Sequence, residues 1–257
     1  MNNKPNISAV WSDPSINMEA WGMSLGQSLP SGVVVFFRAD DIGVPDDNCH
    51  RMIETFREYF APLCLAVVPS WLDEKSWKTL RGWTGDWDLW CWHQHGWAHE
   101  NHQKDGKSCE FGSDRPLADK IADIKAGRDK LSAIMGDDFQ PFFTPPWNRI
   151  DPETGQALAD LGYIAVSRSS GENEKIPTPP SLPDLSVNVD LHTRREIDPV
   201  QARYALEQDF VNASETGRVG IMLHHQLMNE TAFRFLAGLL LGVTSGSCRT
   251  VHLGDLL

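Results

Sequence analysis

Four histidines crowd the segment Trp90 to His102, WCWHQHGWAHENH, and two of them, His95 and His99, are four residues apart. Imidazole is the commonest neutral metal ligand in proteins, and two imidazoles on one side of a short turn can share one divalent ion. Such a pair leaves other positions at the ion open for water and substrate. The spacing therefore suggests a metal site that still needs a carboxylate, a base and a fold.

Two acidic residues, Asp40 and Asp41, follow the apolar run VVVFF at 33–37. Adjacent acids after a strand often serve only as turn formers or helix caps. In a functional interpretation the two side chains diverge, so that one binds a cation and the other accepts a proton from water bound there. With His95 and His99, Asp41 completes a set of two histidines and one carboxylate. This set suits zinc or another first-row divalent ion, and also non-haem iron.

The segments that must position these residues alternate between strand-like and helix-like patterns. Short β-branched or aromatic runs typical of strands buried on both faces lie at 33–37, 63–68, 89–92, 142–144, 163–166, 186–191, 219–223 and 250–253. Helical patterns lie at 46–60, 73–82, 116–135, 152–161, 199–211 and 231–241. This alternation builds right-handed βαβ units and a parallel sheet. We predict an α/β fold, an irregular (β/α) barrel of about seven parallel strands.

The domain organisation follows from the same patterns. Residues 1–30 show little periodicity and several Pro and Gly residues, and we expect them to form an N-terminal extension that packs on the barrel. Residues 31–257 are expected to form a single barrel domain. The Pro-rich stretch at 176–184 is predicted to be a loop within that domain, because the strand and helix patterns resume directly after it.

Composition narrows the classes of partner. An apolar fraction of 41% indicates a globular core, and a net charge of −12 argues against nucleic acid or an anionic membrane as partner. The expected partner is a small molecule or an oligosaccharide. The first residues lack the apolar core of a signal peptide and no run approaches eighteen apolar residues, so we expect a cytoplasmic protein. The five scattered cysteines form no CxxC pair and are expected to be reduced.

The order of the polar clusters resembles that of a known family. In such barrels reacting groups lie beyond the carboxyl ends of the strands. ADD at 39–41, HGWAH at 95–99, FTPPWN at 143–148 and IMLHH at 221–225 resemble in turn the acidic, H-x-x-x-H, Arg-x-Pro-aromatic and Leu-His motifs of the polysaccharide deacetylases. The unit shared by that family is the NodB homology domain. The resemblance extends over about residues 33–253 but is carried by these short motifs.

The resemblance implies a role for each motif. Asp40 would be the catalytic base, and Asp41, His95 and His99 would bind one divalent metal ion, with zinc favoured. A backbone N–H at Trp147 would help to hold the oxyanion, and His224 would protonate the leaving amine. The remaining residues expected at the substrate pocket are Pro146, Trp97, His225 and Asp190.

The chain departs from the family pattern in three places. Thr144 stands where the family has the arginine that orients the base, and Arg38 or Arg149 could replace it; we favour Arg38, which leaves the same strand end as Asp40. Gly96 and Ala98 replace the usual small hydroxyl residues, which indicates a divergent branch.

The late motif offers two histidines, and a strand directs His224 and His225 to opposite faces, so only one can be the acid. Asp190, which closes the sixth strand with His192, could support the acid or could simply face solvent.

These observations predict a metal-dependent hydrolase of carbon–nitrogen bonds that removes an N-acyl group, expected to be acetyl, from an amino sugar or a related small carbohydrate. A catalytically inactive carbohydrate-binding relative is an alternative, suggested by Thr144. A non-haem iron oxygenase with the same three ligands is a further alternative. Those enzymes generally have antiparallel double-stranded β-helices, and the alternation of helix and strand argues against that fold.

Overall fold

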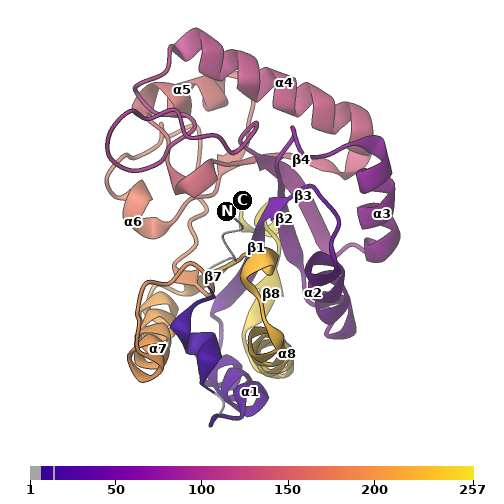
Figure 1. Cartoon of the computed structure of the whole chain (residues 1–257), viewed down its shortest axis with the longest axis vertical. Helices are drawn as coiled ribbons and strands as arrows, with labels where there is room; N and C mark the ends of the chain where they lie inside the picture. Colours follow the sequence, from indigo (N-terminus) through magenta and orange to yellow (C-terminus); the bar gives the residue numbers. More distant parts are fainter. Residues whose placement is uncertain (1–6, 14) are drawn as a thin grey trace, which may run out of the picture.

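The strands of the computed structural model, which describes residues 7–13 and 15–257, form one parallel sheet. Its order is β5-β4-β3-β2-β1-β7-β6, and β8 pairs with β1. The sheet is curled, with helices around its outer face (Figure 1). The predicted (β/α) barrel is therefore confirmed. The strands are β1 (Val34–Ile42), β2 (Leu63–Val67), β3 (Trp90–His95), β4 (Phe139–Thr144), β5 (Ala165–Val166), β6 (Val189–Asp190), β7 (Arg218–Leu223) and β8 (Arg249–Val251).

The longest strand, β1, is central because three strands pair with it. On one side β7 pairs along residues 34–39. The other partners divide the strand, since β8 pairs with residues 34–36 and β2 pairs with residues 38–42. The carboxyl half of β1 is thus held between β7 and β2, and this half carries the acidic pair of the predicted site.

The sheet is irregular where the barrel closes between β5 and β6. Both strands have only two residues, and isolated parallel bridges join Val166 to Asp184 and Ser169 to Val187. A buried ion pair between Arg168 and Asp184, with Nε and Oδ2 2.6 Å apart, lies at the same seam. The barrel is therefore closed by scattered bridges and side chains. The segments on both sides of the seam are too short for a continuous strand pair.

The helices begin where the sequence places capping residues. The side chains of Asp46, Asp73, Asp151, Asp198 and Asn229 each accept a hydrogen bond from a backbone N–H in the first helical turn. All six predicted helices are present, whereas α1 and the short α6 were not among the predicted helices. The helices are α1 (Met18–Ser28), α2 (Asp47–Glu58), α3 (Glu74–Thr84), α4 (Leu117–Met135), α5 (Pro152–Asp160), α6 (Ser170–Asn173), α7 (Pro199–Glu215) and α8 (Glu230–Ser245).

The N-terminal segment packs on the barrel through α1. Its Gly22 lies against the backbone of α8, where a Cβ would come within 2.3 Å of the Phe235 carbonyl oxygen. Gly238 on α8 lies equally close to the backbone of α1, because a Cβ at this position would lie 2.0 Å from the Glu19 carbonyl oxygen. Glycine on both helices therefore permits this close approach. Residues 1–6 and 14 of the predicted extension lie outside the described residues, and its boundary at residue 30 stays a prediction.

The apolar core lies on both faces of the sheet. The larger cluster fills the space between the outer face and the helices, and a smaller one that includes Phe36, Cys64 and Met222 lies inside the curl. All five cysteines are free, as expected. Among the described residues, no helix combines the length and apolar character needed to cross a membrane. The cytoplasmic location stays a prediction.

Candidate functional site

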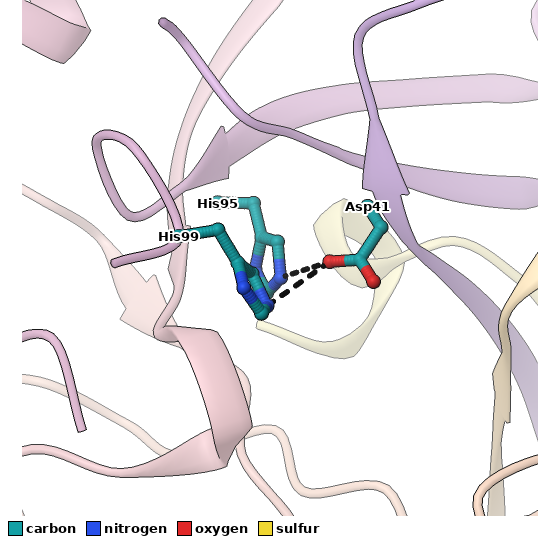
Figure 2. A group of neighbouring side chains, drawn as sticks. All are labelled: Asp41, His95 and His99. Atoms are coloured by element: carbon teal, nitrogen blue, oxygen red, sulfur yellow. Dashed lines mark hydrogen bonds and ion pairs between the residues drawn. The ribbon is translucent and has the colours of Figure 1, made fainter. Parts of the chain in front are cut away.

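Asp41, His95 and His99 converge at the carboxyl end of the sheet (Figure 2). The Oδ1 atom of Asp41 lies 3.2 Å from Nε2 of His95 and 3.2 Å from Nε2 of His99. Ligands about 2.0 to 2.2 Å from a tetrahedral zinc ion lie roughly 3.3 to 3.6 Å apart. The three side chains thus have nearly the spacing that a single ion requires, and they form a candidate metal site in the described chain.

The tautomer of His95 supports this interpretation. Its Nδ1 lies 2.9 Å from the carbonyl oxygen of Thr144, which can only accept a hydrogen bond, so Nδ1 carries the proton. In the neutral ring Nε2 then presents a lone pair to the carboxylate of Asp41. Two lone pairs at 3.2 Å repel unless a cation lies between them. Either a metal ion or a second proton on His95 satisfies this arrangement.

Charge at the site stabilises the ionised carboxylate. Burial raises the pKa of Asp41, but the hydrogen bond from His95 and the charges of His95, His224 and His99 outweigh burial, and the net pKa is far below its ordinary value. Burial lowers the pKa of His95, whereas Asp41 and Asp40 raise it by more. Negative charge on Asp41 and Asp40 and positive charge on the histidines therefore stabilise each other at this site.

Backbone strain is concentrated around this group. Four of the five non-glycine residues with positive φ in the described chain lie here. Such conformations cost free energy and persist where the surrounding structure holds them, often at functional sites. The four residues are Asp41, His99, Trp147 and Asn148.

The loop between the two histidines is held by Glu110, which sequence reasoning missed. This buried carboxylate accepts hydrogen bonds from the N–H groups of Trp97 and Ala98, at 3.2 and 2.7 Å. A Cβ at Gly96 would lie 2.2 Å from Oε2 of Glu110 and 2.6 Å from the ring of Pro146. Glycine at 96 therefore fits its left-handed φ of 59° and the tight space beside Glu110.

The strained Asp41 is held by Gln226. Its Nε2 donates to the backbone carbonyl of Asp41 at 2.8 Å, across 185 residues of sequence. Gln226 follows His224 and His225 in the sequence, and it lines a cavity that Asp41, His95 and His99 also line. Nothing in its type or local pattern distinguishes it from other glutamines, because its partner is set by the meeting of β1 and the loop after β7.

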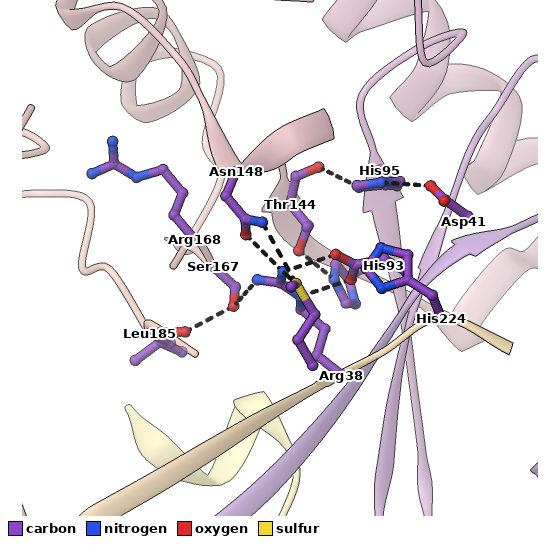
Figure 3. A network of polar contacts seen from close by, with 12 residues as sticks. Arg38, Asp41, His93, His95, Thr144, Asn148, Ser167, Arg168, Leu185 and His224 are labelled. Carbon is purple, nitrogen blue, oxygen red and sulfur yellow. Dashed lines mark hydrogen bonds and ion pairs between the residues drawn. The ribbon is translucent and has the colours of Figure 1, made fainter. Parts of the chain in front are cut away.

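Arg38 and Asp40 form a buried bidentate pair next to Asp41, and Arg38 lies within the polar network of Figure 3. Nε of Arg38 lies 2.8 Å from Oδ1 of Asp40, and Nη2 lies 2.8 Å from Oδ2. The guanidinium is further held by Oγ of Ser167, at 2.9 Å, and Oδ1 of Asn148, at 2.7 Å. Ser167 follows β5 and Asn148 follows β4, so the barrel fixes the arginine from three sides.

The pair keeps Asp40 ionised. Burial raises the pKa of Asp40, but the charge of Arg38 and the nearby His95 and His224 lower it below its ordinary value. Arg149, the other candidate partner, instead donates to the carbonyl of Ser108 and pairs with Glu172. Between the two arginines, the structure brings only Arg38 to Asp40.

Thr144, which stands in the position of the family arginine, has a different set of contacts. Its hydroxyl lies 2.9 Å from Nε2 of His93, and its carbonyl orients His95. His93 is fully buried, which lowers its pKa to about 3 and keeps the ring neutral. His93 is not among the three convergent ligand residues of the described chain.

His224 and His225 point to different surroundings. His224 lines the same cavity as Asp40 and Asp41, and its side chain reaches into the polar network in Figure 3. His225 is buried, does not line the cavity, and lies with Nε2 3.5 Å from Oδ2 of Asp46. The alternative that His225 is the acid, and its placement at the substrate pocket, therefore disagree with the structure. The physical reason is the alternation of side chains at the end of β7.

Asp190, for which both support of the acid histidine and a solvent-facing position were open, is engaged within its own loop. Its carboxylate accepts hydrogen bonds from the N–H groups of His192 and Thr193, at 2.9 Å each, within its own loop. His192 instead contacts the acid candidate, because its Nδ1 accepts a hydrogen bond from the backbone N–H of His224 at 3.0 Å. Burial and the charges of His224 and His225 hold the pKa of His192 well below its ordinary value.

A cavity of about 930 Å³ opens beside the acidic and histidine side chains. Trp147 and Asp190 line it as expected, but Trp97 and Pro146 do not. Trp97 packs against an inner apolar cluster, and Pro146 is buried beside the metal loop. Neither side chain is thus brought to the cavity lining, and a role for either in substrate binding stays a prediction.

Trp71 is a cavity residue that sequence reasoning did not single out. It is 38% exposed, and its ring centroid lies 5.9 Å from that of His99. The ring of Trp147 also lies close to His99, with a centroid distance of 4.3 Å. The N–H of Ser70 donates to the carbonyl of Trp97, and a Cβ at Gly43 would lie 2.8 Å from Cβ of Trp71. Two aromatic rings thus flank the metal-site histidine, and they come from two different loops.

No family model and no curated protein matches this sequence. Solved structures do match. A protein assigned as a polysaccharide deacetylase from Mycobacterium smegmatis aligns with a TM-score of 0.64 at 12% identity, covering 89% of this chain and 91% of that one. The peptidoglycan deacetylase PdaC from Bacillus subtilis aligns with a TM-score of 0.52 at 11% identity, covering 89% and 91%.

A third structure is a CE4 family pseudoenzyme from Bacillus anthracis, with a TM-score of 0.55 at 10% identity, covering 89% of this chain and 66% of that one. At these identities the likeness concerns the fold and not the chemistry, and the fold is shared by active and inactive proteins. The chain therefore has the fold of the polysaccharide deacetylases.

Proposed function

We propose that this protein is a metal-dependent deacetylase that hydrolyses an N-acyl bond, with acetyl the favoured group, of an amino sugar or a related carbohydrate. One observation carries the proposal: the Asp41, His95 and His99 group lies beside the Arg38–Asp40 pair, and Asp40 lines the same cavity as the three ligands. The first group offers ligands for a divalent ion, with zinc favoured. The second offers an ionised carboxylate that is not needed as a ligand.

The residues fit amide hydrolysis as follows. A divalent ion bound at the three ligands supplies Lewis-acid polarisation of the carbonyl and lowers the pKa of water. Asp40, kept ionised by Arg38, accepts the proton of the attacking water. His224, on the same cavity, protonates the leaving nitrogen.

The loop of Trp147 supports the developing oxyanion. The N–H groups of Asn148 and Arg149 are engaged by the carbonyls of Pro145 and Pro146. Trp147 precedes them at a left-handed φ of 55°, and its N–H is our candidate for the oxyanion donor.

The cavity supports a carbohydrate as substrate. Its volume of about 930 Å³ is large enough for more than one sugar ring. Trp71 and Trp147 offer aromatic faces, on which the apolar face of a pyranose can pack. The neighbours named as polysaccharide and peptidoglycan deacetylases agree with this class of substrate.

The proposal is tested with protein loaded with zinc and with protein stripped by a chelator. We expect acetate release from N-acetylglucosamine or its short oligomers only from the loaded protein. Asp40→Asn should abolish acetate release while one zinc ion per chain is retained. Asp41→Ala should lose both acetate release and bound zinc.

Two results would overturn the proposal. One is stoichiometric zinc with no acetate release from any N-acetylated sugar in the panel, together with sugar binding that Asp40→Asn leaves unchanged; this result would identify an inactive carbohydrate-binding relative. The other is full activity in Asp41→Ala.

A further inference from the structure

The cavity lining includes an arginine that has no partner among the described residues. Arg195 lines the cavity and is exposed, and within the described residues its guanidinium makes no hydrogen bond, ion pair or ring contact. The chain has 35 acidic and 23 basic residues, so carboxylates are in surplus. Arg195 differs in this respect from Arg149, the other arginine in the cavity lining, which pairs with Glu172.

The neighbouring arginine shows the contrast. Arg194 is nearly buried and pairs with Asp209 at 2.7 Å and with Glu196 at 2.9 Å, and it also donates to the carbonyl of Asp190. It therefore fixes the loop between β6 and α7. Arg195 follows directly and faces the cavity, with its donors left for a ligand.

The carboxylates that share the cavity wall already have partners. Asp209 pairs with Arg194, and Asp190 is engaged by the N–H groups and the hydroxyl of its own loop. Glu172 is shared by three cations, with Arg149 at 3.5 Å, Lys175 at 3.2 Å and Lys107 at 3.6 Å.

The cations around Glu172 outnumber this one carboxylate, so positive charge remains beside it. Lys107 and Arg149 also line the cavity, and one carboxylate cannot neutralise two or more cations. The buried Nε of Arg149 lies 3.5 Å from Oε1 of Glu172 without forming a hydrogen bond to it. The cavity lining therefore holds three cationic side chains, Lys107, Arg149 and Arg195, and of these only Arg195 has no carboxylate partner among the described residues. We call these three side chains the cationic region.

We infer that this cationic region binds an anionic substituent of the substrate, a carboxylate or a phosphate, through Arg195. The inference rests on the proposed function and deepens it, because it assigns a charge to the sugar. Guanidinium groups bind both kinds of oxyanion through paired N–H donors. A negative group held by Arg195 would also restrict how the sugar can lie in the cavity that the metal-site residues line.

The experiment measures binding of three sugars to zinc-loaded protein by calorimetry. N-acetylglucosamine is neutral, N-acetylglucosamine 6-phosphate carries a phosphate, and N-acetylmuramic acid carries a carboxylate. We expect at least one anionic sugar to bind about tenfold more tightly than the neutral one, which is the size of a charge-assisted hydrogen bond. The preference should weaken with added salt.

Arg195→Gln should remove the preference and leave affinity for the neutral sugar unchanged. The matched control is Arg249→Gln, since Arg249 is an exposed arginine on β8, at the opposite end of the strands. Equal affinities of the three sugars for the wild type, or equal effects of the two substitutions, would overturn the inference. An Arg195-dependent preference without acetate release would sustain the inference while the proposed function fails.

Discussion

The guanidinium of Arg38 meets both carboxylate oxygens of Asp40, at 2.8 Å each, although the two residues are only two apart on one strand. Both side chains therefore point to the same face of β1, toward the inside of the barrel. Asp41, the next residue, points to the ligand group instead, because its φ of 62° breaks the strand geometry. This one irregular residue allows adjacent acids to have separate roles.

Removal of Arg38 should impair catalysis without loss of the metal. We expect Arg38→Met to lower kcat by about 10² or more, because Asp40 loses both its orientation and the charge that keeps it ionised. Breaking a buried pair also costs about 3 to 5 kcal/mol of stability, so Arg38→Lys is measured beside it and should retain more activity.

The readouts for Arg38 are kcat on a neutral N-acetyl sugar and zinc content. Arg149→Met is the matched control, and its kcat on the neutral sugar should be unchanged because Arg149 does not contact Asp40. An equal loss in both variants would contradict the assignment.

Metal binding should depend on His99 and not on the nearby His102. Zinc at a hundredfold excess over its Kd should stabilise the wild type by about 2.7 kcal/mol. We expect His99→Ala to lose this effect, since His99 offers one of three convergent ligand atoms, and His102→Ala to keep it. Thermal unfolding with and without zinc provides the measurement, and zinc-dependent stabilisation of His99→Ala would reject the ligand set.

The two late histidines should differ in kcat. His224→Asn should lower kcat by about 10² to 10⁴ with zinc binding intact, because it removes the proton donor from the cavity. His225→Asn should leave kcat nearly unchanged, since His225 faces Asp46 on the other side of β7. A reversed order of the two variants would show that the acid is His225.

Trp71 should contribute to sugar affinity more than to the chemical step. We expect Trp71→Ala to raise KM by roughly two- to tenfold with little change in kcat, because aromatic contacts of this kind contribute about 0.5 to 1.5 kcal/mol. Trp71→Phe, which keeps an aromatic face, should recover much of the loss. Unchanged KM in Trp71→Ala would remove the ring from the substrate contacts.

His192 should make stability depend on pH. Its folded-state pKa lies well below the ordinary value because of burial, so the unfolded chain takes up a proton that the folded chain does not. Stability therefore rises with pH and falls below about pH 6.5, by up to about 1.4 kcal/mol per pH unit.

His192→Asn, whose side-chain oxygen can accept the hydrogen bond from the N–H of His224, should flatten this slope by about one proton. Urea unfolding of both proteins at a series of pH values between about 5 and 7 measures the slope of the unfolding free energy against pH. An unaltered slope would show that another group controls the dependence.

The sequence alone was enough for the barrel and for the convergent ligand atoms. Buried strands have continuous apolar runs, and parallel strands bring their carboxyl ends to one edge, so Asp41 and His95 could be placed together from local patterns. The helix starts were equally local, because a capping side chain such as Asp46 bonds within its own turn. The seam between β5 and β6 escaped this reasoning, since its isolated bridges have no periodic pattern.

Only the tertiary structure decided between residues of the same type. Side-chain direction separated His224 from His225, and the convergence of β1, β4 and β5 separated Arg38 from Arg149. Glu110 and Trp71 reach the site from loops that show no motif. The physical reason is that residue type and spacing specify what a strand end can bind, whereas contacts between distant segments depend on how the whole sheet curls.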